Sequence, residues 1–344
     1  MPKPEHERKL DFQEIRRNRE AKMTWKDIAA VYDMKVSTLR GIFSRWLATE
    51  EGQKAPGFQM PSPSWVGGEC RVIMSRPNNT FLFGVAGDRH HASKYHRQDV
   101  LEDLHQRFER AGVDCVFDAG NWIDGESRFN KHDITRAGMD PQIHLMAEET
   151  PQIGVPTFAV WGDDHEGWYA QREGIDMGQH AEHIMQHAGH DWHDLGFMEA
   201  HIVLRNANTG AETIMAVSHP GGGSAYALSY RPQKIIESLE GGEKPAVVVM
   251  GHYHKLEALN VRNVWCLQSG TTCDQTPFLR KKSIEVHVGG AILGLEQDPE
   301  SGAIIGFSPQ IIRYFNRGFY NNRWSHSGTP NQPERVLVPQ KPSK

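Results

Sequence analysis

Five short apolar runs in this chain each end in side chains that commonly bind metals, and this repeated feature constrains the fold more than any other. In the first run, Phe81–His90, the residues through Ala86 are apolar or small, which is typical of a strand buried on both faces. Asp88 and His90 follow, and on an extended backbone they would lie on the same side, because side chains alternate with a period of two. A strand that ends in such groups predicts an open α/β sheet with a site beyond the strand ends.

The same design recurs four more times along the chain. The further runs are Val113–Asp118, Val155–Trp161, Ile214–Ser218 and Ala246–Met250. They lead in turn into Asn121 and Asp124, into Asp163-Asp164-His165-Glu166, into His219, and into His252 and His254. We therefore expect carboxylates, an amide and imidazoles to gather at one edge of the structure.

Composition places the chain among ordinary globular proteins. Hydrophobic residues make up 38% of its 344 residues and charged residues 24%. No apolar run approaches the ~18 residues that a membrane helix needs, so we expect no membrane partner. The charged N-terminus lacks the apolar segment of a secretory signal. The four cysteines show no CxxC spacing, which favours reduced thiols and predicts a cytoplasmic protein.

The first 47 residues have the pattern of a small helical domain with a positive charge. Residues 1–55 carry 12 Lys and Arg against 9 Asp and Glu, whereas the remainder of the chain is acidic, with a net charge of −8. Helices are predicted over Leu10–Lys22, over Trp25–Tyr32 with Thr24 as N-cap, and from Ser37, as its cap, to Trp46. A basic head on an acidic body predicts that the head meets a polyanion.

This head resembles the helix-turn-helix of DNA-binding proteins. The resemblance implies that the third helix reads DNA, with RNA as an alternative. The candidates for groove or phosphate contacts are Lys35, Ser37, Thr38, Arg40 and Arg45. A small helical bundle that binds protein instead is the other interpretation.

Composition divides the rest of the chain into three parts. Residues 48–69 are rich in proline and glycine and are predicted to be a linker. Residues 70–320 form the main domain, and the polar, proline-rich residues 321–344 are predicted to be a flexible tail.

Within the main domain the pattern predicts an edge strand at Cys70–Met74, a helix at Ser93–Arg110, loops or short helices over 125–150, a helix at Gly174–Gly189, a hairpin of Phe197–Arg205 with Glu212–Ser218, a helix at Tyr226–Glu240 interrupted at Pro232, and strands at Val261–Gly270, Ser283–Leu295 and Ala303–Phe315.

The helix at Gly174–Gly189 draws attention because histidines recur along it. His180, His183, His187 and His190 fall on neighbouring positions of one face. We interpret them as a polar face rather than a second metal site, because a ligand set also needs a carboxylate or a facing element.

Taken together, the five polar blocks resemble the signature of the calcineurin-like metallophosphoesterases. The resemblance covers about residues 78–290, and the blocks are Asp88-x-His90, Gly120-Asn121-x-x-Asp124, Asp164-His165-Glu166, His219 and Gly251-His252-x-His254. It implies a four-layer α/β/β/α sandwich and a site that holds two divalent metal ions, with manganese first and zinc, iron or magnesium as alternatives. Such an ion pair orients a phosphate and activates a water as hydroxide.

The resemblance also implies a role for each residue. Asp88, His90 and His254 would hold the first ion, and Asp164, His219 and His252 the second. His165 would face the leaving-group oxygen as an acid or charge stabiliser, and Asp124 would orient it.

Two positions depart from the pattern of the family. Asn121 stands where the family has an aspartate that bridges the metals, and Asp164 stands where the family has an asparagine. The two changes are reciprocal, so the charge of the ligand set is unaltered, and our hypothesis is that Asp164 takes over the bridge. One tight ion with one weak ion, or a degenerate and inactive site, are the alternatives.

The reaction predicted from these features is cleavage of a phosphate ester in DNA, as in the Mre11/SbcD-type nucleases of the family. Arg89, Arg128, Lys131, Arg280, Lys281 and Lys282 are candidates to line a path for the nucleic acid backbone, and Trp122, Trp161 and Trp168 are predicted to pack in the core rather than stack on bases. Two alternatives remain: a phosphomonoesterase whose head recruits a partner, and a DNA-binding regulator with a decayed metal site. A homodimer also remains open.

Overall fold

The computed structural model describes two compact units. The described residues are 10–21, 23–36, 38–39, 42–43, 71–223, 225–240, 242 and 244–315. The chain divides into a unit of residues 1–62 and a unit of residues 63–344. Each unit is described by itself below.

The first unit contains short helices around a small apolar core. Helix α1 (Phe12–Glu20) begins at Asp11, whose carboxylate accepts hydrogen bonds from two backbone N–H groups of the first turn. Helix α2 (Trp25–Val31) begins at Thr24, as predicted. The core consists of Ile15, Ile28, Ala29, Leu39 and Phe43.

The candidate nucleic-acid contacts of this unit are described only in part. Lys35 and Thr38 are both exposed. Val36 is already helical, so the third helical segment begins before Ser37, which we had expected as its cap. Ser37, Arg40 and Arg45 lie outside the described residues.

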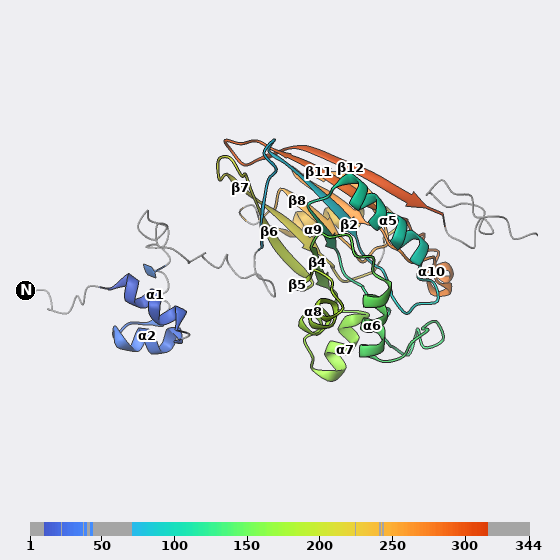
Figure 1. Ribbon diagram of the computed structural model, residues 1–344, viewed down its shortest axis with the longest axis horizontal. Coiled ribbons are helices and arrows are strands. Elements are labelled where there is room, and N and C mark those ends of the chain that lie inside the picture. Colours follow the sequence, from blue (N-terminus) through green and yellow to red (C-terminus); the bar gives the residue numbers. More distant parts are fainter. Residues whose placement is uncertain are drawn as a thin grey trace, which may run out of the picture. The chain divides into compact units, whose positions relative to one another are not determined.

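The second unit is a mixed α/β structure built on two six-stranded sheets (Figure 1). The first sheet has the order β1-β6-β7-β8-β10-β9, and its strands are β1 (Arg71–Met74), β6 (Glu199–Arg205), β7 (Glu212–Ser218), β8 (Val247–Met250), β10 (Val264–Ser269) and β9 (Leu256–Val261). The second has the order β12-β11-β2-β3-β4-β5, and its strands are β12 (Ile304–Tyr314), β11 (Val288–Gln297), β2 (Thr80–Ala86), β3 (Cys115–Asp118), β4 (Thr157–Trp161) and β5 (Trp192–Phe197).

The strands that precede the polar blocks run parallel within each sheet. Strands β2, β3 and β4 are parallel neighbours in the second sheet, and β7 and β8 are parallel neighbours in the first. All four residues of β3 and of β8 are buried, as expected for parallel strands covered on both faces. Parallel order places the carboxyl ends of neighbouring strands at one edge.

The main hydrophobic core lies between the two sheets. It combines Phe83 and Phe117 of one sheet with Val217, Val249 and Leu267 of the other, all less than 1% exposed. The Phe83 and Phe117 rings meet edge to face with centroids 5.0 Å apart. This apolar layer holds the two sheets face to face.

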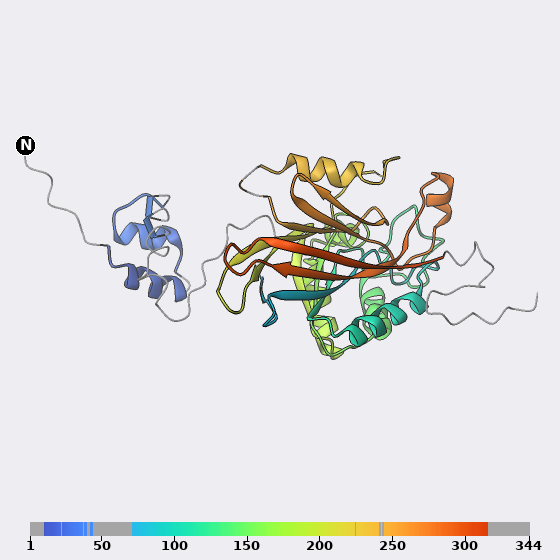
Figure 2. The same cartoon turned by 90° about the horizontal axis from the view of Figure 1, so that it is seen from above.

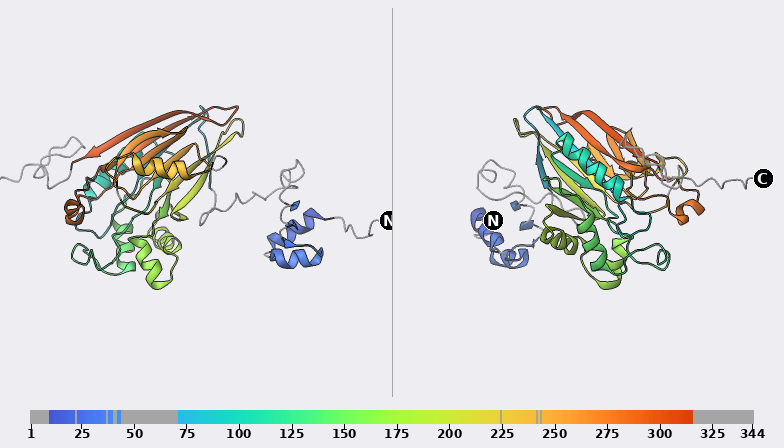
Figure 3. Two further views of the ribbon diagram at one scale, coloured as in Figure 1. Left: turned by 180° about the vertical axis from the view of Figure 1, so that it is seen from behind. Right: turned by 45° about the vertical axis from the view of Figure 1, so that its right-hand side comes forward.

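Helices cover the outer faces of both sheets, which gives the expected four-layer order. Helix α5 (Gln98–Ala111) packs on β11 and β2, and helices α6 (Met139–Glu149), α7 (Glu166–Glu173) and α8 (Met177–His187) form a second cluster near β4 and β5. Helix α9 (Tyr230–Ser238) packs on the other sheet. Seen from above, α5 and α9 lie on opposite sides of the strands (Figure 2), and from behind α9 crosses the strands that it covers (Figure 3).

Two predicted helices differ from the observed ones. The helix expected from Ser93 begins only at Gln98, because Ser93 and His96 pair as isolated bridges with Ile134 and Cys273. The helix expected to break at Pro232 does not break there. It begins at Tyr230, so the proline stands in the first turn, where a missing N–H costs no helical hydrogen bond.

Several elements were not predicted from the sequence. Strands β5 and β9 and helix α7 had no counterpart among the expected elements, and α6 occupies part of the segment expected to form loops or short helices. The Gly174–Gly189 helix is present as α8, and the short helix α10 spans Pro277–Lys281. Among the described residues, none of the helices has the length and apolar character needed to span a membrane.

The packing of α5 on β2 depends on one aromatic side chain. Phe108 is fully buried, and a Cβ added at Gly84 would lie only 2.8 Å from its ring, so the two residues fit closely. We expect Phe108→Ala to lower the free energy of unfolding by about 3–5 kcal/mol, because it leaves a cavity over the strand. The neighbouring exposed Glu109→Ala is the control and should change it by less than about 0.5 kcal/mol. Equilibrium unfolding in urea measures both, and equal effects would contradict the assigned packing.

Candidate metal centre

The predicted site residues all follow the carboxyl ends of five strands. Asp88 and His90 follow β2, Asn121 and Asp124 follow β3, Asp164 and His165 follow β4, His219 follows β7, and His252 and His254 follow β8. One expectation about the backbone was wrong. Strand β2 ends at Ala86, so Asp88 and His90 lie in a loop and not on an extended strand.

The backbone around the site is held in an unusual conformation. Six of the nine predicted metal-binding and catalytic residues have a positive φ: Asp88, His90, Asn121, His165, His252 and His254. This region is rare for residues with a Cβ. The loops are held in it by hydrogen bonds, such as those from the Asp88 N–H to the Gly120 carbonyl (2.7 Å) and from the His90 N–H to the Asn121 carbonyl (2.9 Å). Such local strain is concentrated at functional sites.

The structure brings one group of three ligands together at Asp88, His90 and His254. The His254 Nε2 lies 3.4 Å from the Asp88 Oδ1 and 3.1 Å from the His90 Nε2. The other carboxylate oxygen of Asp88 accepts a hydrogen bond from the His252 N–H. Two imidazole nitrogens and one carboxylate oxygen therefore face a common point.

A second group of three ligands forms at Asp164, His219 and His252. The Asp164 Oδ1 lies 3.5 Å from the His219 Nε2, and its Oδ2 lies 3.6 Å from the His252 Nδ1. Each group draws residues from both sheets. Because His252 and His254 are two residues apart on one loop, the two groups are neighbours.

Backbone carbonyls fix which nitrogen of each histidine in the second group is free to bind. The His219 Nδ1–H donates to the Ala119 carbonyl at 2.5 Å, and the His252 Nε2–H donates to the Gly222 carbonyl at 2.6 Å. A carbonyl only accepts, so these nitrogens carry the protons and the opposite nitrogens carry the lone pairs. Both lone pairs face Asp164, which is the usual arrangement of metal-binding histidines.

The polar atoms at the centre of both groups lack partners within the protein. The buried atoms without a hydrogen bond include the Asp88 Oδ1, Asn121 Oδ1, Asp164 Oδ1, His219 Nε2 and His252 Nδ1. Buried polar atoms normally have a partner. This set of carboxylate, amide and imidazole donors fits divalent metal ions, which would satisfy all of them.

The electrostatics of the site favour a positive charge at these points. Burial opposes the charged form of His219, but the adjacent Asp164 carboxylate, 3.5 Å away, and the charge of Asp88 outweigh burial and raise the pKa of His219 to about 9. Burial acts to raise the pKa of Asp88, yet the neighbouring imidazoles, His254 first, hold it below its usual value. A metal ion would take the place of the second proton of His219 and would bind the ionised Asp88.

His165 lies beside the first group and is held by Asp124 in a way that we did not expect. The His165 Nδ1–H donates to the backbone carbonyl of Asp124 at 2.7 Å, whereas the Asp124 carboxylate lies 3.8 Å from that nitrogen and 3.2 Å from the His90 Nδ1. The Trp168 ring packs against His165 with centroids 4.6 Å apart. Asp124 thus contacts both His165, through its carbonyl, and His90, through its carboxylate.

Sequence reasoning missed the part played by Glu166. This side chain is fully buried, and its Oε1 accepts hydrogen bonds from the N–H groups of Asn121 (2.8 Å) and Gly162 (3.3 Å). Burial raises the pKa of Glu166 to about 8. The residue ties the loops after β3 and β4 together. Its place directly after His165 was visible in the sequence, but not the direction of its side chain.

The side chains predicted to line a nucleic-acid path divide into two classes. Arg89 was wrongly assigned to the surface: it is fully buried, and its Nη2 lies 2.5 Å from the Asp118 carboxylate beneath the site. Arg128, Lys131, Arg280, Lys281 and Lys282 are exposed.

Trp122 and Trp161 belong to the apolar cluster under α6 to α8, as predicted.

The histidines of α8 behave as a polar face. His180 lies 2.7 Å from the Asp140 carboxylate, and the His183 and His187 rings pack on each other. In the parts of the chain that the structure describes, the groups able to hold a metal include none of these histidines.

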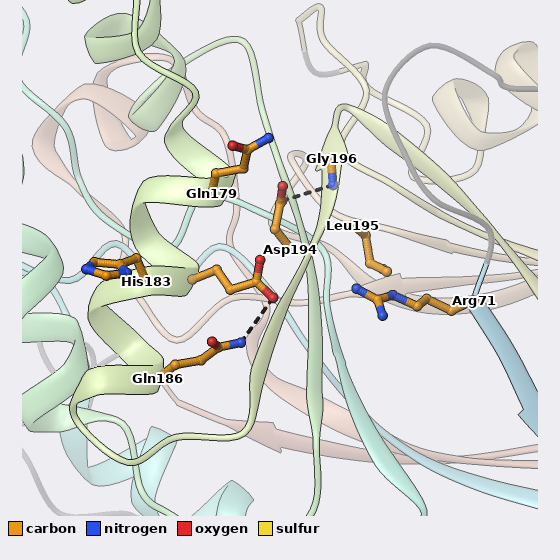
Figure 4. A pocket seen from close by; sticks show the side chains of 8 residues that line it. Arg71, Gln179, His183, Gln186, Asp194, Leu195 and Gly196 are labelled. Carbon is orange, nitrogen blue, oxygen red and sulfur yellow. Dashed lines mark hydrogen bonds between the residues drawn. The ribbon is translucent and has the colours of Figure 1, made fainter. Parts of the chain in front are cut away.

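A cavity of about 520 Å³, separate from the metal-binding groups, lies between α8, β5 and Arg71 of β1 (Figure 4). Its lining is mostly polar and of mixed charge, with Glu182 and Asp194 opposite Arg71. The Asp194 carboxylate accepts a hydrogen bond from the Gly196 N–H. None of the metal-group residues lines this cavity.

Comparisons with known proteins give weak similarities. The sequence matches no protein-family model and no curated protein. Among solved structures, the chain is similar to a novel archaeal phosphodiesterase (13% identity, 67% of this chain and 99% of the other, TM-score 0.35). It is similar at the same coverage to zinc-complexed Vps29 from Entamoeba histolytica (13% identity, TM-score 0.30). A predicted phosphoesterase of Streptococcus pneumoniae shares 14% identity over 68% of this chain and 98% of its own, with a TM-score of 0.31. Similarity at this level does not identify an activity.

The carboxyl of Asp194, which lines the cavity between α8 and β5, should make the stability of the protein depend on pH. Burial raises its pKa to about 6, and the Asp176 and Glu182 carboxylates add to the rise. The folded protein holds this proton more tightly than the unfolded chain, so the resulting stabilisation is present below about pH 4 and is lost as the pH rises to about 6. Asp194→Asn keeps the acceptor for Gly196 and should be more stable than the wild type at pH 7, by on the order of 2 kcal/mol.

Urea unfolding at pH values from 4.5 to 7.5 measures this difference, which should shrink toward the acid end. Asp191→Asn, which changes an exposed carboxyl at the start of the same strand, is the control. An identical pH dependence for Asp194→Asn and wild type would contradict the prediction.

Proposed function

We propose that this protein is a metal-dependent phosphoesterase with two ions at the groups described above. The observation that carries the proposal is the pair of three-ligand groups, each drawn from both sheets, whose inward atoms have no partner in the protein. A structural role alone does not require so many unsatisfied buried polar atoms, since each one costs about 1–3 kcal/mol.

The residues of the two groups have distinct roles in this proposal. Asp88, His90 and His254 would hold one ion, and Asp164, His219 and His252 would hold the other. Two divalent ions at such a site orient the oxygens of a phosphate and activate water for attack. Asn121 adds an amide oxygen, which is buried and has no other partner. Asp164 directs one oxygen toward each histidine of its group. We propose that this carboxylate would take the role of shared ligand between the two ions, for which the neutral amide of Asn121 is poorly suited.

His165 is the proposed general acid. Its Nδ1 proton is committed to the Asp124 carbonyl, so the Nε2 is the atom left to exchange a proton with the substrate. Burial works against its charged form, but the carboxylates of Asp164 and Asp124 outweigh this and raise the pKa of His165. An imidazole whose charged form is favoured in this way, and 20% of whose side chain is exposed, is suited to donate a proton to the leaving-group oxygen.

For the substrate, we propose a phosphodiester of DNA, with manganese as the metal. Exposed cations occur on two segments that are anchored at the site. Arg128 and Lys131 lie on the loop fixed to Asp124 by the Asn130 side chain. Arg280 and Lys281 lie in α10, which follows Thr271 and Thr272, two residues that donate to the Asp88 carbonyl. Exposed cations on two segments anchored at a metal site favour an extended polyanion over a small ester.

The decisive measurement is the hydrolysis of labelled single- and double-stranded DNA, RNA, a generic phosphodiester and a generic phosphomonoester in manganese, with and without a chelator. We expect chelator-sensitive cleavage of DNA, lowered by more than about 100-fold in His252→Ala, which is more than a change in an outer-shell residue costs. His187→Ala, at an exposed histidine of α8, is the matched control and should keep full activity.

Each other outcome has a defined meaning. Cleavage of the monoester alone would overturn the nuclease assignment and leave the first unit as a recruiting module. DNA binding without turnover of any ester, in protein with metal bound, would overturn the enzyme and favour a regulator.

The exchange between Asn121 and Asp164 gives a further prediction. Asp164→Asn removes the only carboxylate of the second group, so we expect a loss of metal and a fall in activity of at least about 100-fold. The double variant Asn121→Asp/Asp164→Asn restores the charge of the ligand set and should recover most of the activity. Metal content and hydrolysis rate are measured on the same preparations. Full activity of the single variant would contradict the role of Asp164.

A further inference from the structure

A third group of metal-binding side chains lies next to the site but outside it. His91 and His96 come from the loop between β2 and α5, and Glu149 is the last residue of α6. One ligand atom of each lies within 4.8 Å of the others. The Glu149 Oε2 is 2.7 Å from the His91 Nδ1, in a hydrogen bond whose proton an ion would replace, and 3.8 Å from the His96 Nε2.

The hydrogen bonds around His96 leave one of its nitrogens facing only acceptors. Its Nδ1 lies 2.7 Å from the Arg89 backbone carbonyl, so that nitrogen carries the proton. Its Nε2 faces the Gln98 Oε1 at 3.2 Å and the Glu149 Oε2 at 3.8 Å. The Gln98 amide cannot be turned to help, because its Nε2 already donates to the Glu102 carboxylate and to the Glu149 carbonyl.

A second proton, on the His96 Nε2, would give these two oxygens a donor, but it is unfavourable. The side chain is only 6% exposed, and burial disfavours a charged imidazole. A neutral His96 directs the lone pair of Nε2 toward two oxygens that also carry lone pairs. A cation at that point turns the repulsion among these three atoms into coordination.

We propose that His91, His96 and Glu149, with the Gln98 side-chain oxygen, bind a third divalent ion, for which zinc is the best match. Two imidazole nitrogens and two oxygens form a mixed set suited to zinc. The separations of 2.7, 3.2 and 3.8 Å bracket the ~3.3 Å expected between ligands about 2.0–2.1 Å from a tetrahedral ion. The partly exposed Glu149 gives the ion access from solvent.

This ion has a structural role in support of the catalytic loops. The His91 N–H donates to the Trp122 carbonyl, and the His91 carbonyl accepts from the Asp124 N–H, both at 2.8 Å. An ion on the His91 ring would therefore connect the loops after β2 and β3 to the start of α5 and to the end of α6. The inference does not rest on the proposed phosphoesterase activity.

The test is the metal content of the full-length protein after removal of all metal and reconstitution with zinc, followed by removal of loosely bound ions. The wild type should retain three equivalents. His96→Gln/Glu149→Gln should retain two, and His219→Ala/His252→Ala should keep the ion of the third group. His187→Gln, at an exposed histidine, is the matched control and should match the wild type. Circular dichroism establishes that each variant is folded.

A measurement on the wild type alone guards against variants that fail to fold. Anomalous scattering at the zinc edge should give a peak within bonding distance of the His96 Nε2 and the Glu149 Oε2. Zinc should also raise the thermal midpoint of His219→Ala/His252→Ala, and this rise should become smaller when His96→Gln is added, because only the Asp88, His90 and His254 group then remains. Equal zinc content in the wild type and His96→Gln/Glu149→Gln, or no peak at these atoms, would overturn the proposal.

Discussion

The packing of two sheets face to face is the constraint on which the rest of this structure depends. The side chains of Phe83, Phe117, Val217, Val249 and Leu267 fill the space between the sheets and exclude water from it. Because of this packing, the carboxyl ends of β2, β3 and β4 lie opposite those of β7 and β8. Neither three-ligand group exists within one sheet: Asp88 and His90 need His254 from the other sheet, and Asp164 needs His219 and His252. The site is a product of the apolar layer beneath it.

The site itself is costly to the fold. It places carboxylates and imidazoles where they are buried, leaves several of their atoms without partners, and holds six residues at positive φ. Each such feature costs on the order of 1–3 kcal/mol. Supporting contacts below the site offset part of this cost, such as the buried pair of Arg89 with Asp118 and the two hydrogen bonds accepted by Glu166. Bound metal ions would supply the missing partners, so metal binding and stability are coupled in this fold.

The strand cores and the identity of the polar blocks were accessible from the sequence because they are local properties. A continuous apolar run such as that of β8 predicts a strand buried on both faces, and the observed strand is buried at all four positions. Strand β9 was missed because its residues show no clear alternation, and its pairing with β10 is settled by the turn at Arg262 and Asn263, both at positive φ. The start of α5 was misplaced because Ser93 and His96 are held by long-range bridges that no local pattern records.

The sequence by itself determined which chemical groups this protein can bring to a site, and the order in which five strands deliver them, because residue type and hydrophobic period are read along the chain. Only the tertiary structure decided which groups meet. It placed Arg89 in the interior and not on a surface path. The Asp124 backbone carbonyl, and not its carboxylate, orients His165. Folding also brings Glu149 next to His91 and His96. The physical reason is the same in each case: burial, tautomer and ligand distance depend on contacts between segments that lie far apart in the sequence.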